Sequence, residues 1–572
     1  MPRALTGLLA LCALCACPSP VAPDAGPPTV VIATPDAGDP TAALFAPNHV
    51  IDVRLELPPS DWETLRHQTR DLFTLLAGDC VAQPFPSPFT TFEGVATIDG
   101  QRLERTTIKK KGFLGSLSTN RPSLKLKFDA LLADQQVSGL DAMTLNNAQQ
   151  DPALVRQCLG YALFAKAGLL APRCSFAHVR VNSVDLGVYV HVEAIDKDFL
   201  RRRFPNAKGN LFEGTLSDFN ATFVRTFDLK SPNTDPADLS TVLSALAAPD
   251  AEVLARLEAV LDVNQFIDFW AMETLLRHWD GYAGNTNNFF LYDDPTTHRF
   301  VFIPWGADAV FTSGPASADN PEGLLLRSQL AQRLYALPST HDRYLARLRF
   351  LLDTVLDEPS LRAEVLRMQD LVAPLTDFIQ RPQLANGLAD VRRFIDTRRA
   401  KLNAVLANPP TAMAPTERPS PCLARLGSIS ATFSTTWGTL DAPNPFTAGT
   451  GTLDFSLGAP IALRGPVAST AGLDLTGNDG PRVGVNVFSY LGDGGATVAA
   501  LRLIPARYPP VGPQPFDLFE RYGVMIDFSN QVATPVGIFG NGTLAFEDAG
   551  TSDGALVTGH FSAEIYRWPF GG

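Results

Sequence analysis

The sequence changes its hydrophobic periodicity at a proline-rich segment, residues 409–421 (PPTAMAPTERPSP). From residue 45 to 408, strand-like alternation and helical spacing of apolar residues follow each other. From residue 422 to 572, short strand-like runs are separated by glycine-rich turns with almost no helical period. A chain of 572 residues is also too long for one ordinary domain. We therefore predict an α+β fold at 45–408, a linker at 409–421 and an all-β, sandwich-like domain at 422–572.

The N-terminus has the pattern of a bacterial export signal. Arg3 precedes an apolar stretch that is shorter than the roughly 20 residues of a membrane helix. Residues 14–17 (LCAC) then resemble a lipobox, in which a small residue precedes the cysteine that becomes lipidated. An ordinary secretion signal cleaved nearby is the alternative. We predict a signal peptide at 1–17, lipid on Cys17 and an exported protein anchored to the membrane of the cell envelope.

The segment that follows the predicted anchor, residues 18–44, is rich in Pro, Ala, Gly and Asp. Such a composition cannot bury a core and predicts a disordered tether. The four cysteines beyond it show no CxxC spacing, which argues against a zinc site. Export permits disulfides, and Cys158–Cys174 is a plausible local pair, although the sequence does not fix the connectivity. The net charge of −12 without a long basic run argues against a nucleic-acid partner.

The most informative polar segment is residues 278–285 (HWDGYAGN). Its spacing is that of a protein-kinase catalytic loop, His-Arg-Asp followed by four residues and Asn. Phosphoryl transfer needs a carboxylate for the hydroxyl proton and a neutral oxygen ligand for the metal ion, and Asp280 and Asn285 suit these roles. A capped helix end followed by a turn containing Asn285, Asn287 and Asn288 would give the same pattern.

Asp308 stands directly after a predicted strand that ends at Trp305, about two dozen residues beyond Asn285. The metal-binding Asp of a kinase has such a position. Mg²⁺ prefers hard oxygen ligands and often takes only one or two carboxylates from the protein. Asp308 is therefore a candidate Mg²⁺ ligand, and a turn Asp beside Ala and Gly is the alternative interpretation.

Four stretches in this order resemble the CotH (spore coat protein H) kinase family. Residues 278–292 are similar to its D-x-Y-x-x-N-x-x-N-F signature and residues 303–308 (IPWGAD) to its P-W-D/G-x-D signature. Residues 111–116 (KGFLGS) with 125–129 (KLKFD) resemble its glycine loop and lysine strand, and 187–196 (GVYVHVEAID) its G-x-Y-x-x-x-E-x-I-D strand. The resemblance covers about residues 48 to 405.

The resemblance implies a divergent protein-kinase-like domain that uses ATP and Mg²⁺ (or Mn²⁺) to phosphorylate Ser or Thr of exported proteins. It makes Asp280 the catalytic base and Asn285 and Asp308 metal ligands. Nucleotide binding then falls to a lysine, either Lys127 or Lys125, and to Gly112, Gly115, Ser116 and Glu193. Glycines let backbone N–H groups approach phosphates closely. For Glu193, a salt bridge at a strand end is the alternative.

Two departures from the family pattern bear on activity. Gly306 stands where many members have Asp, and the predicted helix at 152–169 contains no Glu to pair with the lysine, as an ordinary kinase requires. Asp151 and Arg156 are the charged candidates near the start of this helix. A pseudokinase without phosphoryl transfer, or a surface adhesin whose acidic loops hold Ca²⁺, are therefore the alternative functions.

Overall fold

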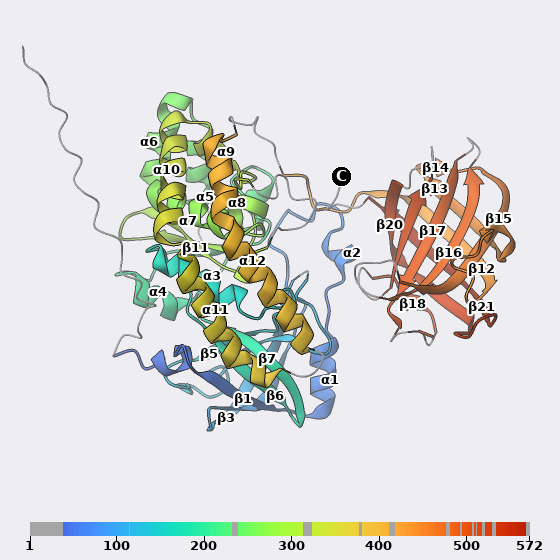
Figure 1. Ribbon diagram of the computed structural model, residues 1–572, viewed down its shortest axis with the longest axis horizontal. Coiled ribbons are helices and arrows are strands. Elements are labelled where there is room, and N and C mark those ends of the chain that lie inside the picture. Colours follow the sequence, from blue (N-terminus) through green and yellow to red (C-terminus); the bar gives the residue numbers. More distant parts are fainter. Residues whose placement is uncertain are drawn as a thin grey trace, which may run out of the picture.

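A computed structural model describes residues 38–567 except 114, 232–237, 313–322, 377–379, 411–417, 476–480, 492–494, 506–507, 511, 518–520 and 529–533. The chain forms a mixed α+β part and an all-β part that lie side by side (Figure 1). Cys17 and the rest of the predicted signal peptide lie outside the described residues. Among the described residues, none of the helices combines the length and the apolar character needed to cross a membrane.

The mixed part begins with a closed barrel of seven strands. They are β1 (Val50–Glu56), β2 (Thr91–Ile98), β3 (Gln101–Lys111), β4 (Ser123–Lys127), β5 (Ala142–Asn146), β6 (Cys174–Val181) and β7 (Val184–Val192). Parallel pairing of β1 with β6 closes the barrel. Because side chains alternate between the two faces of a strand, Ile108, Leu124 and Leu126 fill the barrel, while Lys109, Lys111 and Lys125 point outward.

The second half of the mixed part is mainly helical and packs around a four-stranded sheet in the order β11-β10-β8-β9. The strands are β8 (Leu211–Gly214), β9 (Asp228–Leu229), β10 (Phe289–Asp294) and β11 (Arg299–Pro304). The helices are α3 (Arg156–Lys166), α4 (Lys197–Arg203), α5 (Asp238–Leu246), α6 (Asp250–Val260), α7 (Val263–Leu276), α8 (Tyr282–Asn285), α9 (Gln329–Tyr335), α10 (Pro338–Thr354), α11 (Glu358–Val372) and α12 (Gln380–Ala407). Helix α7 is buried along most of its length and is the centre of this core.

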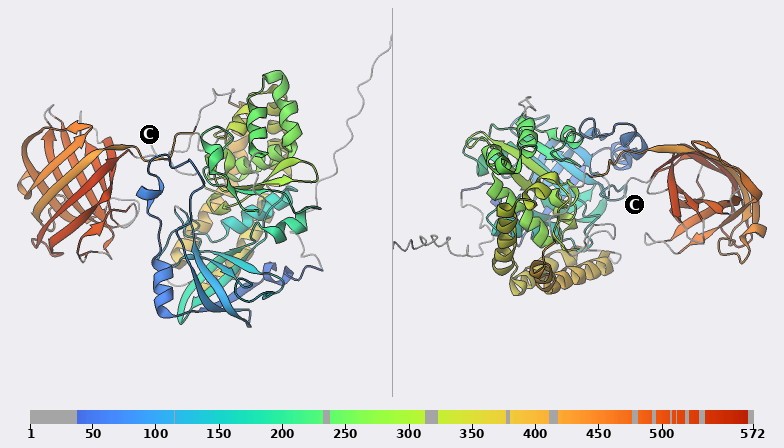
Figure 2. Two further views of the ribbon diagram at one scale, coloured as in Figure 1. Left: turned by 180° about the vertical axis from the view of Figure 1, so that it is seen from behind. Right: turned by 90° about the horizontal axis from the view of Figure 1, so that it is seen from above.

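The C-terminal strands belong to one hydrogen-bonded sheet, so the prediction of a sandwich of two sheets is wrong. They are β12 (Arg425–Thr436), β13 (Gly449–Leu457), β14 (Ala459–Pro460), β15 (Leu463–Asp474), β16 (Arg482–Leu491), β17 (Ala496–Leu503), β18 (Gln514–Pro515), β19 (Arg521–Asp527), β20 (Thr534–Ala549) and β21 (Leu556–Tyr566). The sheet curls round on itself, and a bridge joins Trp437 to Ala471 of β15 (Figure 2). Because the sheet curls, its inner face encloses an apolar core. In a sandwich, two facing sheets would enclose such a core between them.

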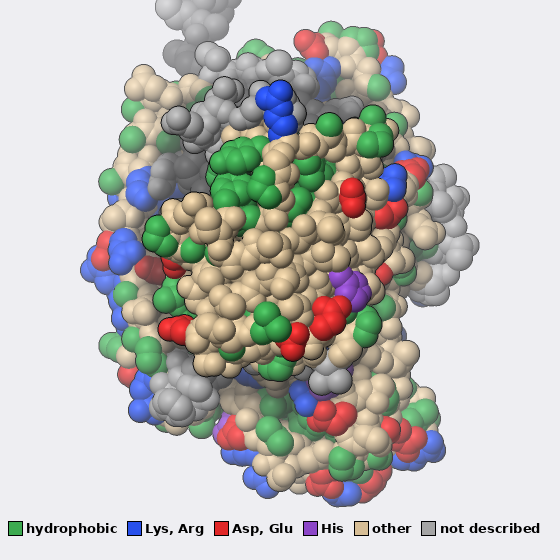
Figure 3. Space-filling model, turned by 90° about the vertical axis from the view of Figure 1, so that its right-hand side faces the viewer, with side chains coloured by type: hydrophobic (Ala, Val, Ile, Leu, Met, Phe, Trp, Pro, Cys, Tyr) green, Lys and Arg blue, Asp and Glu red, His purple; other side chains and the backbone are tan. Residues whose placement is uncertain are grey.

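The outer face of this curled sheet is polar where β12 crosses it. Ser428, Ser430, Thr432 and Ser434 are exposed and alternate with buried residues, which is the pattern of a strand with one solvated face. Figure 3 looks onto this side of the molecule and shows a surface made mostly of backbone and of side chains that are neither hydrophobic nor charged, with a group of hydrophobic side chains toward its upper part.

The two parts are tied together beyond the linker. A segment between α1 (Pro59–His67) and β2 reaches the all-β part, where α2 (Leu72–Leu75) packs against it. Phe73 of α2 contacts the ring of Tyr566, with centroids 5.6 Å apart. A disulfide joins Cys80 of this segment to Cys422, and a second joins Cys158 to Cys174, the pair that we expected.

The end of the predicted tether is folded. Ala42–Phe45 forms a short 3-10 helix (η1), in which Leu44 is buried, and Asp39 pairs with Arg173 at 2.6 Å. Disorder was therefore the wrong prediction for the last residues of 18–44, because Leu44 and Phe45 pack with the core of the barrel.

Candidate active site

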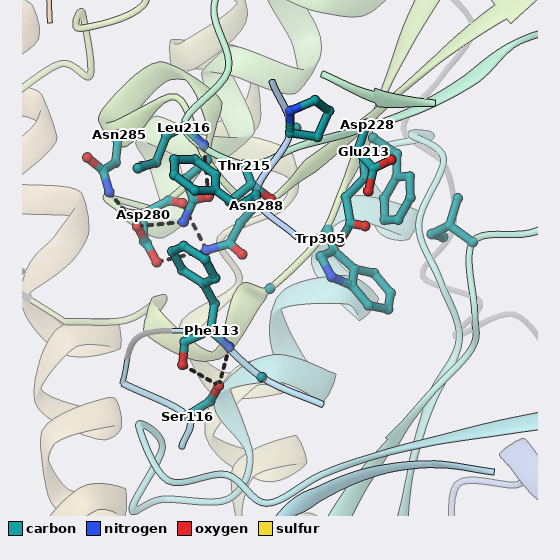
Figure 4. A pocket seen from close by; sticks show the side chains of 18 of the residues that line it. Phe113, Ser116, Glu213, Thr215, Leu216, Asp228, Asp280, Asn285, Asn288 and Trp305 are labelled. Carbon is teal, nitrogen blue, oxygen red and sulfur yellow. Dashed lines mark hydrogen bonds between the residues drawn. The ribbon is translucent and has the colours of Figure 1, made fainter. Parts of the chain in front are cut away.

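A cavity of about 2430 Å³ lies where the barrel, the helical half and the linker to the all-β part meet. Its lining includes the outward lysines of β3 and β4, the loop after β3, the loop between α7 and β10, and the residues that follow β11. Figure 4 shows Asp280, Asn285 and Asn288 close together, with Phe113 and Ser116 of the loop after β3 nearby. Segments that are far apart in the sequence therefore meet at one site.

Asp280 is held by three amide side chains of its own loop. Its Oδ1 accepts hydrogen bonds from Asn285 Nδ2 at 2.6 Å and from Asn287 Nδ2 at 3.3 Å, and its Oδ2 accepts one from Asn288 Nδ2 at 2.8 Å. Burial raises the pKa of Asp280, and these hydrogen bonds oppose the rise. The three asparagines thus orient the carboxylate and favour its charged form.

The loop is anchored to the helix that precedes it. Helix α7 ends at Leu276, and the next residue, Arg277, adopts a left-handed conformation and turns the chain. Buried Glu273 accepts hydrogen bonds from the backbone N–H groups of Tyr282 at 2.8 Å and Ala283 at 2.7 Å. Burial raises the pKa of Glu273 to about 8, and these two hydrogen bonds oppose the rise. The loop between Asp280 and Asn285 is therefore fixed before any ligand binds.

Asp308 lines the cavity and lies in a short 3-10 helix, η3 (Ala307–Ala309), which follows β11 and Gly306. Burial raises its pKa to about 7, and the negative charge of Asp280 adds to the rise. The two carboxylates are therefore close enough to repel each other, and a cation between them would relieve this repulsion.

The donor set at this point fits a kinase-type metal ion. Asp308 would supply carboxylate oxygens, and Asn285, whose side-chain nitrogen donates to Asp280, would supply its side-chain oxygen. No group of three or more His, Cys, Asp or Glu side chains within the described ranges is placed to hold a metal ion. Mg²⁺ commonly takes one or two carboxylates together with phosphate oxygens and water, so a small donor set is what such a site requires.

The structure separates the two lysines that the sequence left open. Lys125 stands opposite Lys109 in the register of β4 with β3, and it lines the cavity. Lys127 shares its face but stands two residues further along β4, where its side chain is 47% exposed and pairs with Asp129 at 3.1 Å. Two residues of a strand span about 7 Å, and Lys127 is not among the residues that line the cavity, so its assignment to the nucleotide stays a prediction.

Lys111 is a cavity lysine that the sequence analysis quoted but did not assign. Its Nζ donates a hydrogen bond to Asn146 Oδ1 at 2.7 Å, and Asn146 Nδ2 donates one to Gln157 Oε1 of α3 at 3.0 Å. Burial lowers the pKa of Lys111 to about 8. The helix without Glu therefore reaches the lysine through two amides instead of a carboxylate.

The charged residues near the start of α3 act on the site from outside the cavity lining, and the negative charge of Asp151 adds to the rise in the pKa of Asp308. Asp151 accepts backbone hydrogen bonds from Ala153 at 3.0 Å and Arg156 at 2.8 Å and lies 3.6 Å from the Arg156 guanidinium. Both side chains are buried outside the cavity lining. They fix the first turn of α3, which in turn supports the backbone of η3 next to Asp308.

The glycine loop lies at the cavity as expected. Gly112, Gly115 and Ser116 all line it, and Ser116 Oγ accepts a hydrogen bond from the backbone N–H of Phe113 at 3.2 Å. Arg70 supports the loop from beneath, since it donates to the carbonyl of Gly112 at 3.1 Å and its guanidinium lies 4.8 Å from the ring centroid of Phe113.

Glu193 does not face the cavity. It is 4% exposed and forms ion pairs with Arg173, at 2.8 Å, and with Arg202. These ion pairs confirm the salt-bridge interpretation, and the nucleotide-binding role of Glu193 stays a prediction. The next three residues of the chain, Ala194, Ile195 and Asp196, line the cavity in its place.

Arg418 is a further cavity residue that sequence reasoning missed. It belongs to the segment predicted as a linker, is 9% exposed and hydrogen-bonds the loop at Asn285 and Thr286. A single arginine in a proline-rich stretch carries no pattern that could have predicted this contact.

Residues 108–400, more than half of the chain, match the family model described as CotH kinase protein. The chain therefore belongs to the CotH kinase family. It is 26% identical over 187 residues to the inner spore coat protein H of Bacillus subtilis (strain 168), a match that covers 30% of this chain and 51% of that protein. It is also 24% identical over 200 residues to the invasin CotH2 of Rhizopus delemar, covering 31% of this chain and 34% of that protein. The chain thus spans about half of the length of the first relative and about a third of the length of the second.

Two solved structures show weak likeness. The proinflammatory kinase CtkA of Helicobacter pylori aligns at 12% identity with a TM-score of 0.27, covering 53% of this chain and 96% of that chain. The HipA, HipB and operator DNA complex of Shewanella oneidensis MR-1 aligns at 9% identity with a TM-score of 0.30, covering 62% of this chain and 74% of that chain. Likeness at this level carries no inference about the chain.

Proposed function

We propose that this protein is an atypical protein kinase that transfers the γ-phosphate of ATP to Ser or Thr of exported or surface proteins. The observation that carries the proposal is the meeting of Asp280, Asp308 and Lys111 with the glycine loop at one cavity. These are the parts that phosphoryl transfer uses, namely a carboxylate for the hydroxyl, a metal-binding carboxylate, and a lysine and backbone groups for the phosphates.

In this proposal Asp280 accepts the proton of the incoming hydroxyl. Its three amide partners aim the carboxylate and oppose the rise in its pKa that burial causes, and both effects suit a general base. Asp308 and Asn285 would hold Mg²⁺ or Mn²⁺, which neutralises charge on the β- and γ-phosphates when bound. Lys111 and Lys125 would contact the phosphates, and Gly112, Gly115 and Ser116 would close over them.

The proposed substrates lie outside the cytoplasm. The export signal, the predicted lipid on Cys17 and the names of the relatives, an inner spore coat protein and invasins, support a protein at the cell envelope or surface. A lipid anchor would keep the cavity near other envelope proteins.

The pseudokinase is the second candidate. It is favoured by the hydrogen bonds that already occupy both oxygens of Asp280, and by the absence of a glutamate partner for Lys111 on α3. In that case the cavity would bind nucleotide without turnover.

The test uses purified protein with ATP and Mg²⁺ or Mn²⁺. Phosphate incorporation is read by mass spectrometry, and ATP affinity by calorimetry. Asp308→Ala should weaken metal-dependent ATP binding and turnover, whereas Asp280→Ala should leave ATP binding largely intact and slow transfer by roughly 10²-fold or more. Asp342→Ala, which removes an exposed carboxylate on α10, is the matched control and should change neither.

ATP binding by the wild type without any transfer would favour the pseudokinase. Absence of nucleotide binding, together with stabilisation by Ca²⁺ alone, would favour the adhesin.

A further inference from the structure

Arg418 joins the linker to the catalytic loop. Its guanidinium Nη1 donates hydrogen bonds to the backbone carbonyl of Asn285 and, at 2.9 Å, to Thr286 Oγ1. Thr286 has a left-handed backbone with φ of 52°, and its carbonyl accepts a hydrogen bond from the N–H of Ser217 at 2.7 Å. The guanidinium thus braces the turn by which the chain leaves Asn285.

The charge of Arg418 also acts on the loop. Burial lowers the pKa of Arg418 to about 10, so the side chain stays charged at neutral pH. Its positive charge lowers the pKa of Asp280 and that of Asp218 against the rise that burial causes. Asp218 in turn accepts a hydrogen bond from the hydroxyl of Tyr282 at 2.9 Å. Arg418 therefore favours the charged form of Asp280, and its hydrogen bonds hold the backbone at Asn285.

A covalent bond lies close to this contact along the chain. Cys422, four residues after Arg418, forms the disulfide with Cys80. The backbone N–H of Leu423 donates to the carbonyl of Leu76 at 2.7 Å. Since four residues span at most about 14 Å, the disulfide keeps Arg418 within about 14 Å of Cys422, which lines the same cavity as the catalytic loop. The junction between the two parts of the molecule is thus fixed next to the active site.

We propose that Arg418 is a positioning residue for phosphoryl transfer, which holds the turn at Asn285 and Thr286 in place, and that the Cys80–Cys422 disulfide keeps it seated there. The inference rests on the proposed kinase function. It makes the competence of the catalytic loop depend on the attachment of the all-β part. Arg418 acts through Asn285 and Asp280, so it need not touch the nucleotide.

The first experiment needs no phosphoryl transfer. Amide hydrogen exchange is compared between the wild type, Arg418→Ala and Arg418→Lys, all as full-length oxidised protein. We expect Arg418→Ala to speed exchange in the peptide that covers residues 281–288 by at least tenfold, and Arg418→Lys to restore much of the protection, because an ammonium can donate to both oxygens. Arg425→Ala, which removes an exposed arginine paired with Glu564 just beyond Cys422, is the control and should leave this peptide unchanged.

The second experiment measures turnover at saturating ATP. Arg418→Ala should lower kcat roughly tenfold, the size expected for lost hydrogen bonds from a charged donor, with partial recovery in Arg418→Lys. The Cys80→Ser, Cys422→Ser double variant should lower kcat less. Adding Arg418→Ala to it should give no more loss than Arg418→Ala alone, because both changes remove the same contact.

The two experiments fail separately. If the wild type transfers no phosphate, the proposed function fails while the exchange data still decide whether Arg418 holds the loop. Unchanged exchange at 281–288 in Arg418→Ala overturns the positioning role, as does a rise in kcat, which would make Arg418 an inhibitory contact. Fully additive losses from the arginine and cysteine changes overturn the coupling to the disulfide.

Discussion

Replacing Gly306 tests how the catalytic loop and the Asp308 turn fit together. Gly306 has φ of +51°, a left-handed conformation in which other residues cost about 1–2 kcal/mol. A Cβ at this position would lie 2.3 Å from Oδ1 and 2.5 Å from Cγ of Asn288. Asn288 cannot yield freely, because its Nδ2 donates to Asp280 Oδ2 at 2.8 Å and its carbonyl accepts from the N–H of Trp305 at 3.1 Å.

Gly306→Ala should therefore cost both backbone strain and the hydrogen bond from Asn288 to Asp280. A hydrogen bond to a buried charged group is worth about 1.5–3 kcal/mol, so the expected loss in free energy of unfolding is about 2.5–5 kcal/mol in all. Phosphoryl transfer should fall as well, because Asp280 loses one of its three amide partners. Gly306→Asp should behave alike, so the Asp of many relatives would not simply add a metal ligand here.

The assay is urea or thermal unfolding of the full chain, with the transition of residues 45–408 followed separately because the molecule has more than one part. Gly100→Ala is the matched control, since Gly100 has φ of +85° with nothing within 4 Å of its Cβ position. It should cost only the strain of about 1–2 kcal/mol. Asn288→Ala by itself should lower the free energy of unfolding. Combined with Gly306→Ala it removes the overlap, so the double variant should lose less free energy of unfolding than the sum of the two single losses. A Gly306→Ala loss no larger than that of Gly100→Ala, or additive losses in the double variant, would refute the reasoning.

Three further predictions concern other parts of the chain. Cys17→Ser should move the protein from the membrane to the soluble fraction, and continued membrane association would contradict lipidation at this site. A fragment of residues 422–572 should be soluble and melt cooperatively, because its sheet encloses a core of its own, but at a lower temperature than in the full chain without Phe73 and the disulfide; an unfolded fragment would mean that the mixed part completes this core. Burial lowers the pKa of His191 from 6.5 to about 3, so the unfolded chain binds the extra proton and the free energy of unfolding should fall by about 2 kcal/mol from pH 6.5 to pH 5. In His191→Phe, urea unfolding at the two pH values should no longer show this fall in the free energy of unfolding. An unchanged pH dependence in the variant would mean that other groups cause the fall.

Local patterns predicted the elements of the site well. The alternation at residues 124–128 gave a strand with its lysines outward, and the spacing of Asp280 and Asn285 gave a loop at the end of an apolar helix. These features depend on residues close in sequence, where periodicity and turn chemistry are decisive. The two asparagines at 287 and 288 were first weighed as a simple turn, and the structure turns them toward Asp280 instead.

Features that depend on distant segments were beyond the sequence. Which of Lys125 and Lys127 reaches the cavity depends on where the strand ends relative to the glycine loop, and both share one face. The single curled sheet could not be told from two sheets, since strands of both have the same alternation of apolar and polar residues. The ion-pair partner of Glu193 could not be predicted, because Arg173 stands directly before β6, twenty residues earlier, where no motif marks it.

The linker gives the clearest case of a limit set by physics. A proline-rich segment cannot bury a core of its own, so composition predicted a spacer at 409–421. Composition says nothing of single side chains that dock elsewhere, and the docking of Arg418 depends on carbonyls and carboxylates supplied by a loop more than a hundred residues away. The disulfide to Cys80 then removes the freedom that a spacer would have, because it fixes the end of the segment to the barrel half of the molecule. From Arg418 onward, the end of a segment that looks like a flexible spacer in the sequence is thus held by two long-range contacts, and the active site is one of the places it touches.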